Sequence, residues 1–171
     1  LHTFQYCYNL TSVYFPESIN ELDEYSFSSC KNLVGTLNLS SITTINQYAF
    51  EYCSKISYLI LNDTLGEIGS HAFWYCSNLQ NLTLPTELTQ INEYAFSKCT
   101  KLNNTSFNKK LGNIGKYAFD SCTSIAQLVF QSEVTIGLRS FTNCYSIKEI
   151  DFNKTKEIGN FLKKCDEFSN L

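Results

Sequence analysis

Apolar and polar residues change from one periodicity to another within a short stretch of the chain. In the segment CSNLQNLTLPTELTQINEYAFSKC, residues 76–99, Leu82 and Leu84 alternate with polar residues, which is typical of a strand with one buried face. Pro85 lacks the amide hydrogen that a sheet needs, so we expect the strand to end there. The later apolar residues have spacings close to 3.6, typical of a helix, at Ile91, Ala95, Phe96, Cys99 and Leu102. Such a segment is predicted to form a short strand, a turn and one or two helical turns.

The same pattern recurs along the whole chain, and a cysteine marks it most clearly. This cysteine stands at Cys7, Cys30, Cys53, Cys76, Cys99, Cys122, Cys144 and Cys165. The intervals are 23 residues five times, then 22 and 21. Three residues earlier a phenylalanine recurs at Phe4, Phe27, Phe50, Phe73, Phe96, Phe119 and Phe141, and Leu162 takes its place in the last unit.

A fixed period of this length is typical of a solenoid. One unit cannot bury its apolar face alone, whereas stacked units share a continuous core. The sequence therefore predicts a single domain over residues 1–171 with about seven repeats, and places the recurring cysteines and the phenylalanines from Phe27 to Phe141 in the core. Because the chain begins and ends inside a repeat, we expect it to be a piece of a longer array. Uncapped apolar ends would favour end-to-end self-association.

The repeat resembles the BspA-like, or treponemal-type, leucine-rich repeat. Leu79, Leu82 and Leu84 keep the L-x-x-L-x-L spacing of that family, and LPTELTQINEYAFSKC follows its pattern L-P-x-x-L-x-x-I-x-x-x-A-F-x-x-C. The resemblance covers essentially the whole chain and is weaker in the second unit, at Thr105 and in the two short late units. It implies an α/β fold: a right-handed, horseshoe-like arc of about 23-residue repeats, with a parallel concave sheet and short helical turns on the convex side.

The resemblance also implies a class of function. The family is similar to cell-surface, often adhesive, proteins and has no shared catalytic residues. We therefore expect a non-catalytic binding module, secreted or on a cell surface, that recognises a protein or glycan, such as a host cell surface or extracellular matrix, and needs no cofactor. An intracellular protein-interaction scaffold is the alternative. An enzyme on a parallel β-helix is a third interpretation, which the helical spacing and the lack of paired acids disfavour.

Composition narrows the range of partners. The formal net charge is −3, with 13 Lys and Arg against 16 Asp and Glu, so the chain has no basic stripe for nucleic acid. No apolar run approaches the roughly 18 residues of a membrane-spanning helix, and we expect no membrane insertion.

Few residues suggest chemistry. Eight cysteines could form four disulfides, but their fixed place beside alanine and phenylalanine favours a ladder of buried thiols. The only histidines, His2 and His71, each precede a ladder phenylalanine by two residues and have no second histidine nearby, which favours a structural role. The carboxylates form no pair of the kind that glycosidases use, and no metal or phosphate motif is present.

The outward residues of the strands form the predicted ligand-binding surface on the concave side. Because strand leucines point inward, their neighbours point outward. The predicted surface consists of Tyr14, Asn38, Tyr58, Ile60, Asn81, Thr83, Asn104, Ser106, Gln127, Val129, Glu149 and Asp151. Three of its asparagines belong to N-x-S/T sequons, of which the chain has seven, at Asn9, Asn38, Asn62, Asn81, Asn103, Asn104 and Asn153. Sugars there would oppose binding, and accidental sequons in an Asn-rich chain remain the alternative.

Overall fold

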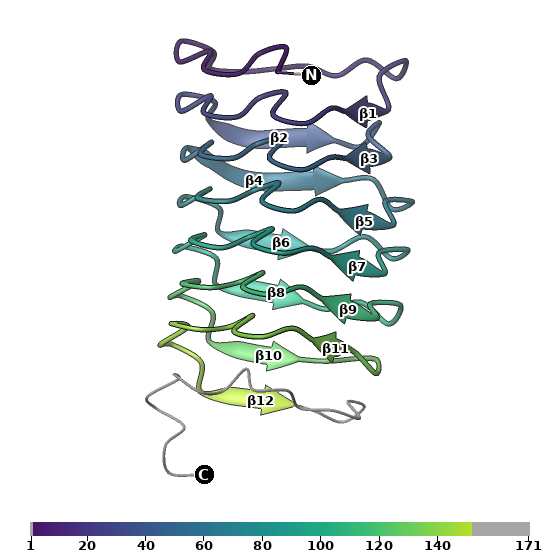
Figure 1. Cartoon of the computed structure of the whole chain (residues 1–171), viewed down its shortest axis with the longest axis vertical. Helices are drawn as coiled ribbons and strands as arrows, with labels where there is room; N and C mark the ends of the chain where they lie inside the picture. Colours follow the sequence, from purple (N-terminus) through teal and green to yellow (C-terminus); the bar gives the residue numbers. More distant parts are fainter. Residues whose placement is uncertain (1, 152–171) are drawn as a thin grey trace.

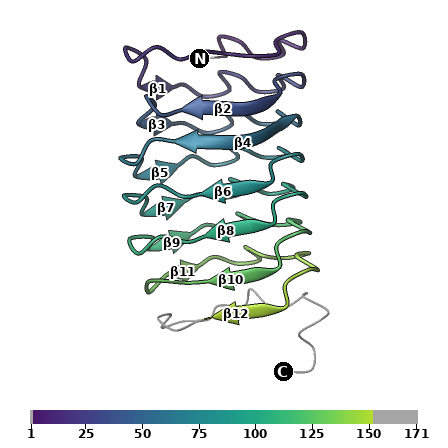
Figure 2. The same ribbon diagram turned by 180° about the vertical axis from the view of Figure 1, so that it is seen from behind.

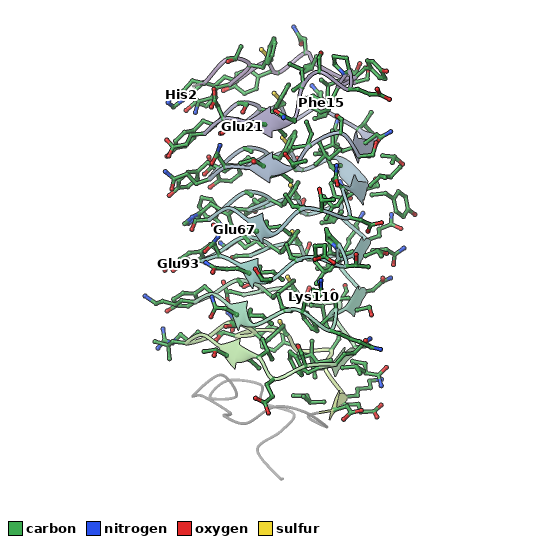
Figure 3. The ribbon with its side chains drawn as sticks, turned by 90° about the vertical axis from the view of Figure 1, so that its right-hand side faces the viewer. His2, Phe15, Glu21, Glu67, Glu93 and Lys110 are labelled. Carbon is green, nitrogen blue, oxygen red and sulfur yellow. The ribbon has the colours of Figure 1, made fainter. Side chains whose placement is uncertain are left out.

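The chain winds into coils that stack along one axis. Each complete coil contributes one longer strand and one short strand on another side of the coil (Figure 1). The structure is a computed structural model that describes residues 2–151. The coils form a nearly straight column in all three views, so the predicted horseshoe-like bend is not developed over these residues (Figures 1, 2 and 3).

The longer strands form parallel sheets along one side of the column. Strands β2 (Gly35–Leu39), β4 (Ile56–Leu61), β6 (Asn81–Thr83) and β8 (Asn104–Ser106) make one sheet, and β10 (Gln127–Val129) pairs with β12 (Glu149–Asp151). Strand β10 also contacts β8, so the six strands follow one another along a single side of the column (Figure 1). We call the outer surface of these strands the strand face.

The short strands form a second parallel sheet on another side of the column. Strands β1 (Glu21–Leu22), β3 (Thr44–Ile45), β5 (Glu67–Ile68), β7 (Gln90–Ile91), β9 (Asn113–Ile114) and β11 (Thr135–Ile136) pair in this order (Figure 2). The register joins equivalent residues of successive coils, for example Ile68 with Ile91 and Ile91 with Ile114. Sequence positions one repeat apart are therefore spatial neighbours.

Alternation of apolar and polar residues explains which side of each strand faces the core. In β6, Leu82 is buried, whereas Asn81 and Thr83 are exposed. In β2, Leu37 and Leu39 are buried, whereas Thr36 and Asn38 are exposed. The strands predicted from period-two alternation are thus present, and their leucines face the core, although Leu59 and Leu61 of β4 are only partly buried.

The predicted helical turns are wrong, because residues 2–151 contain no helix. Two residues per coil, four positions apart, have left-handed backbone angles, such as Tyr94 with φ 55° and Lys98 with φ 62°. An α-helix needs right-handed residues and bonds from each N–H to the carbonyl four residues earlier. Here the Phe96 N–H donates to the Ala118 carbonyl of the next coil at 2.8 Å. The Ser97 N–H donates to the Tyr94 carbonyl, only three residues earlier, at 3.1 Å. The 3.6 spacing therefore marks the inward residues of successive tight turns, and it gives no argument against a parallel β-helix.

Phenylalanine rings form a continuous stack through the core. The rings from Phe27 to Phe141 lie 5.3–5.5 Å apart between centroids and are nearly parallel. Each of them is at most 3% exposed. Parallel, in-register coils place the same residue type above itself, so one phenylalanine per repeat is enough to build the stack.

The seven cysteines within residues 2–151 are free thiols, and the six from Cys30 onward are buried. Each of these six donates from Sγ to the phenylalanine carbonyl of the preceding coil, as Cys53 does to Phe27 at 3.1 Å and Cys76 to Phe50 at 3.3 Å. The Phe27 carbonyl already accepts the Cys30 N–H at 3.1 Å, so the thiol occupies its second lone pair. Cysteine suits this position because its side chain is small and apolar and its thiol is a weak hydrogen-bond donor. Cys165 lies outside the described residues.

The buried thiols predict a loss of stability in alkali. Burial raises the pKa of Cys30 to about 11, and it also raises the pKa of the Cys76 and Cys122 thiols. A folded-state pKa above the unfolded value stabilises the fold fully below the unfolded pKa, about 8.5, and this contribution is lost as the pH rises toward 11. We expect the free energy of unfolding at about pH 10 to lie about 2 kcal/mol or more below its value at pH 7, measured by urea unfolding.

The pKa values of partly buried tyrosines shift in the same direction, and the prediction needs a control for them. Burial raises the pKa of Tyr25, Tyr52 and Tyr94, so a variant with all three residues changed to phenylalanine isolates the thiol contribution. A stability that stays constant from pH 7 to about pH 10 in that variant would contradict the buried-thiol ladder.

Candidate binding surfaces

The strand face brings the predicted ligand-binding residues together. Tyr58 pairs in register with Asn81, and Asn81 pairs with Asn104. The neighbouring stripe pairs Asn38 with Ile60. Toward the end of the column, the paired residues are Thr83 with Ser106, Gln127 with Glu149 and Val129 with Asp151. The predicted residues within β2–β12 therefore form two adjacent stripes along one surface.

The two ends of this surface differ in character. Near the N-terminus, Tyr14 is 84% exposed, and Tyr58 and Ile60 are 41% and 48% exposed. The middle carries uncharged polar residues, and Glu149 and Asp151 make the last strand acidic. The surface is thus apolar at one end and polar or acidic at the other.

Two residues of the apolar end were missed by sequence reasoning. Thr36 pairs with Tyr58, and Val34 is 56% exposed just before β2. The leucines of the second repeat are shifted by one residue, and the register of β2 shifts between Gly35 and Thr36. The shift is visible in the sequence, but its consequence for the surface appears only when the strands are paired. We call Tyr14, Val34, Tyr58 and Ile60 the strand patch.

A polar groove of about 670 Å³ lies over the short strands. Threonine hydroxyls, the amides of Asn46 and Asn92 and the carboxylate of Glu67 line it. The amides already donate to carboxylates of the preceding coil, Asn46 to Glu21 at 3.0 Å and Asn92 to Glu67 at 2.6 Å. Figure 3 shows Glu21 and Glu67 on this side of the column. These contacts tie neighbouring coils together. The groove has no periodic signal in the sequence, because its residue types differ between repeats.

A column of aromatic rings runs beside this groove. His2, Tyr25, Tyr48, His71, Tyr94 and Tyr117 stack with centroids 4.5–4.8 Å apart. At its end, Arg139 lies 5.8 Å from the Tyr117 centroid and donates from Nη1 to its hydroxyl at 2.8 Å. Each ring stands two residues before a recurring phenylalanine, so the shared position was visible in the sequence, but the stacking depends on the in-register coils.

His71 has the environment of a structural residue. Its ring lies between Tyr48 and Tyr94, and its Nδ1 atom is buried without a hydrogen-bond partner. Burial lowers the pKa of His71, while the nearby Glu93 carboxylate acts in the opposite direction. The imidazole is therefore held neutral within the ring column, and no nucleophile is aligned with it in the contacts around it.

Several other features bear on chemistry and on sugar attachment. Within residues 2–151, no group of three His, Cys, Asp or Glu residues could hold a metal ion. The same residues include no helix long and apolar enough to cross a membrane. Asn38 and Asn81 are exposed on the strand face, and the sequon at Asn153 lies outside the described residues.

Comparison with known proteins identifies the repeat. The model of the BspA type leucine rich repeat region matches residues 1–92 and 43–168, with six copies. The crystal structure of a T. pallidum leucine rich repeat protein is similar with a TM-score of 0.76 and 28% identity, over 86% of this chain and 72% of that chain. A search of curated proteins found no match.

Two further crystal structures share the fold at lower identity. A leucine-rich repeat protein from Bacteroides ovatus has a TM-score of 0.58 and 21% identity, over 87% of this chain and 57% of that chain. A leucine rich cell surface protein from Faecalibacterium prausnitzii has a TM-score of 0.64 and 20% identity, over 77% of this chain and 42% of that chain.

Proposed function

Since this chain belongs to the BspA-type leucine-rich repeat family, we propose that it recognises a protein partner at a cell surface or outside the cell, through its strand face. Membership of this family supports a role in protein interaction, and proteins of the family are generally non-catalytic. They are also often surface-associated.

The strand patch is the observation that carries this proposal. Four large apolar side chains from three successive coils are each more than 40% exposed there. Large apolar side chains exposed on one face, here with the polar Thr36 and Asn38 among them, are typical of protein interaction sites, and tyrosine is enriched among the residues that dominate binding energy. The exposed, uncharged Asn81, Thr83 and Ser106 beside the patch supply hydrogen-bonding groups for the rim of such an interface.

A pair of tyrosine variants tests the proposal. Partners are captured from host extracellular matrix and cell extracts, identified, purified and then measured for affinity. Tyr58→Ser should weaken binding about tenfold or more, because the variant loses a tyrosine that would be buried against the partner in the complex. Tyr75→Ser is the matched control, since Tyr75 is 40% exposed on the turn side and serine stands at the equivalent position in Ser29 and Ser121. Equal affinities for both variants would refute the strand face, and binding of purified glycans alone would refute a protein partner.

The alternative location has one observation in its favour. Free thiols fit a reducing compartment, although their burial also protects them outside the cell. Labelling intact source cells with an antibody raised against this chain decides the matter. Staining of intact cells supports the surface location, and staining only after permeabilisation supports an intracellular scaffold.

A further inference from the structure

Two pairs of tyrosines in the ring column face each other across neighbouring coils. Tyr25 and Tyr48 have centroids 4.5 Å apart and planes within 3° of parallel. Tyr94 and Tyr117 lie 4.8 Å apart with an interplanar angle of 11°. His71 stands between the pairs, stacked on Tyr48 and Tyr94. The column therefore contains two separate tyrosine–tyrosine contacts.

All four of these tyrosines are partly exposed. Each belongs to an equivalent position of successive coils, where the chain spacing is about 4.8 Å. Inter-coil hydrogen bonds hold the backbone at these positions, as the Tyr25 N–H donates to Gln47 at 3.2 Å and the Tyr94 N–H to Lys116 at 3.1 Å. The paired rings are thus both reachable by a small oxidant and held together by the fold.

We propose that Tyr25–Tyr48 and Tyr94–Tyr117 are sites of oxidative dityrosine formation, with hydrogen peroxide and a peroxidase as the oxidising system. Each phenol loses one electron and one proton to give a phenoxyl radical. The two radicals form one carbon–carbon bond between the ring carbons next to the hydroxyls, and the hydrogens on those carbons move to the oxygens. The two electrons and two protons convert one hydrogen peroxide into two water molecules.

Other tyrosines lack this arrangement. Tyr52 and Tyr75 lie 5.2 Å apart with planes tilted by 34°, and Trp74 also packs against Tyr52. Tyr14 is the most exposed tyrosine, at 84%, but among the described residues no ring is recorded against it. If ring geometry governs coupling, the two stacked pairs react first and within one molecule. If exposure governs coupling, Tyr14 reacts first and joins separate molecules.

Coupling would bridge adjacent coils covalently. A bond between Tyr25 and Tyr48 closes a loop of one repeat, and the second bond does the same farther along the column. Closing a loop of this length restricts the unfolded chain, as a disulfide does. The oxidised protein should therefore melt several degrees higher than the untreated protein.

The experiment oxidises the whole chain at low concentration with hydrogen peroxide and horseradish peroxidase. Dityrosine fluorescence gives the rate, and mass spectrometry of digested protein gives the linked pairs, each bond removing two hydrogen atoms. The double variant Tyr48→Phe/Tyr117→Phe keeps the stacked rings but removes one phenol from each pair. It should form intramolecular dityrosine at least about fivefold more slowly, because the oriented partners are gone. The matched variant Tyr8→Phe/Tyr145→Phe, at two tyrosines about half exposed and outside the ring column, should keep the wild-type rate.

The folded wild-type chain is also compared with the same chain in urea. We expect the two pairs to dominate the linked peptides only in the folded chain. Covalent dimers through Tyr14, the same distribution of links in urea, or an unchanged rate in Tyr48→Phe/Tyr117→Phe would each overturn the proposal.

Discussion

Replacing Phe96 with alanine is expected to lower the free energy of unfolding by about 3–5 kcal/mol. Phe96 is fully buried, and its ring lies 5.4 Å from both Phe73 and Phe119. The substitution leaves a cavity in the middle of the ring stack, and the surrounding coils can collapse only partly because inter-coil hydrogen bonds fix their spacing. It therefore removes packing on both sides of one coil.

The shape of the unfolding curve should change as well. In a repeat array, each coil contacts only its neighbours, so a weak interface in the middle uncouples the two halves. Calorimetry of Phe96→Ala is expected to show a lower or split transition. Thr83→Ala is the control, since Thr83 is exposed on the strand face and its loss should change stability by less than about 0.5 kcal/mol. Similar small effects for both variants would contradict a core built on the ring stack.

Gly69→Ala is expected to lower the free energy of unfolding by about 1–3 kcal/mol, because an added methyl group has no room. A Cβ atom at Gly69 would lie 2.6 Å from the carbonyl carbon of Asn46 and 2.7 Å from the carbonyl oxygen of Ile45. Both atoms belong to the backbone of the preceding coil, so the coil spacing itself would have to change. Urea unfolding of the variant measures the effect.

Gly66 is the matched control for this prediction. It lies three residues before Gly69, and a Cβ atom there would meet nothing within 4 Å. Threonine occupies the equivalent positions Thr43 and Thr89 in the adjacent coils. Gly66→Ala should be neutral or stabilise the fold by up to about 1 kcal/mol, through a less flexible unfolded chain. If Gly69→Ala were as stable as Gly66→Ala, the close approach of the coils at Gly69 would be wrong.

Sequence reasoning failed most clearly at the turns. The spacing of Ile91, Ala95 and Phe96 is the same in a helix and in the observed turns, because both bury residues about one turn apart. The difference lies in where the N–H groups donate, and the partner of Phe96 is Ala118 in the next coil. A local pattern of residues does not record a partner 22 positions away.

The binding surface was predictable in part. Period-two alternation was enough to place Thr83 and Asn81 outward, because a buried leucine between them fixes the side on which they lie. It was not enough to find Val34 or Thr36, since the leucines of that repeat are out of step and the register shifts beside Gly35. Which outward residues form one patch depends on strand pairing, and pairing is a property of two coils.

The repeat in the sequence was enough to predict the length of the coil, the stacking of coils and the core residues. A constant repeat brings every residue next to its equivalent, so one phenylalanine and one cysteine per unit generate both ladders. The left-handed turns, the pairing of the tyrosines and the different tolerance of the two glycines became visible in the folded chain alone. Asn46 and Asn92 occupy the position of Gly69 in the adjacent coils, so residue type alone would suggest that a side chain fits there. The distance between neighbouring backbones sets the answer, and that distance arises only when the coils are packed.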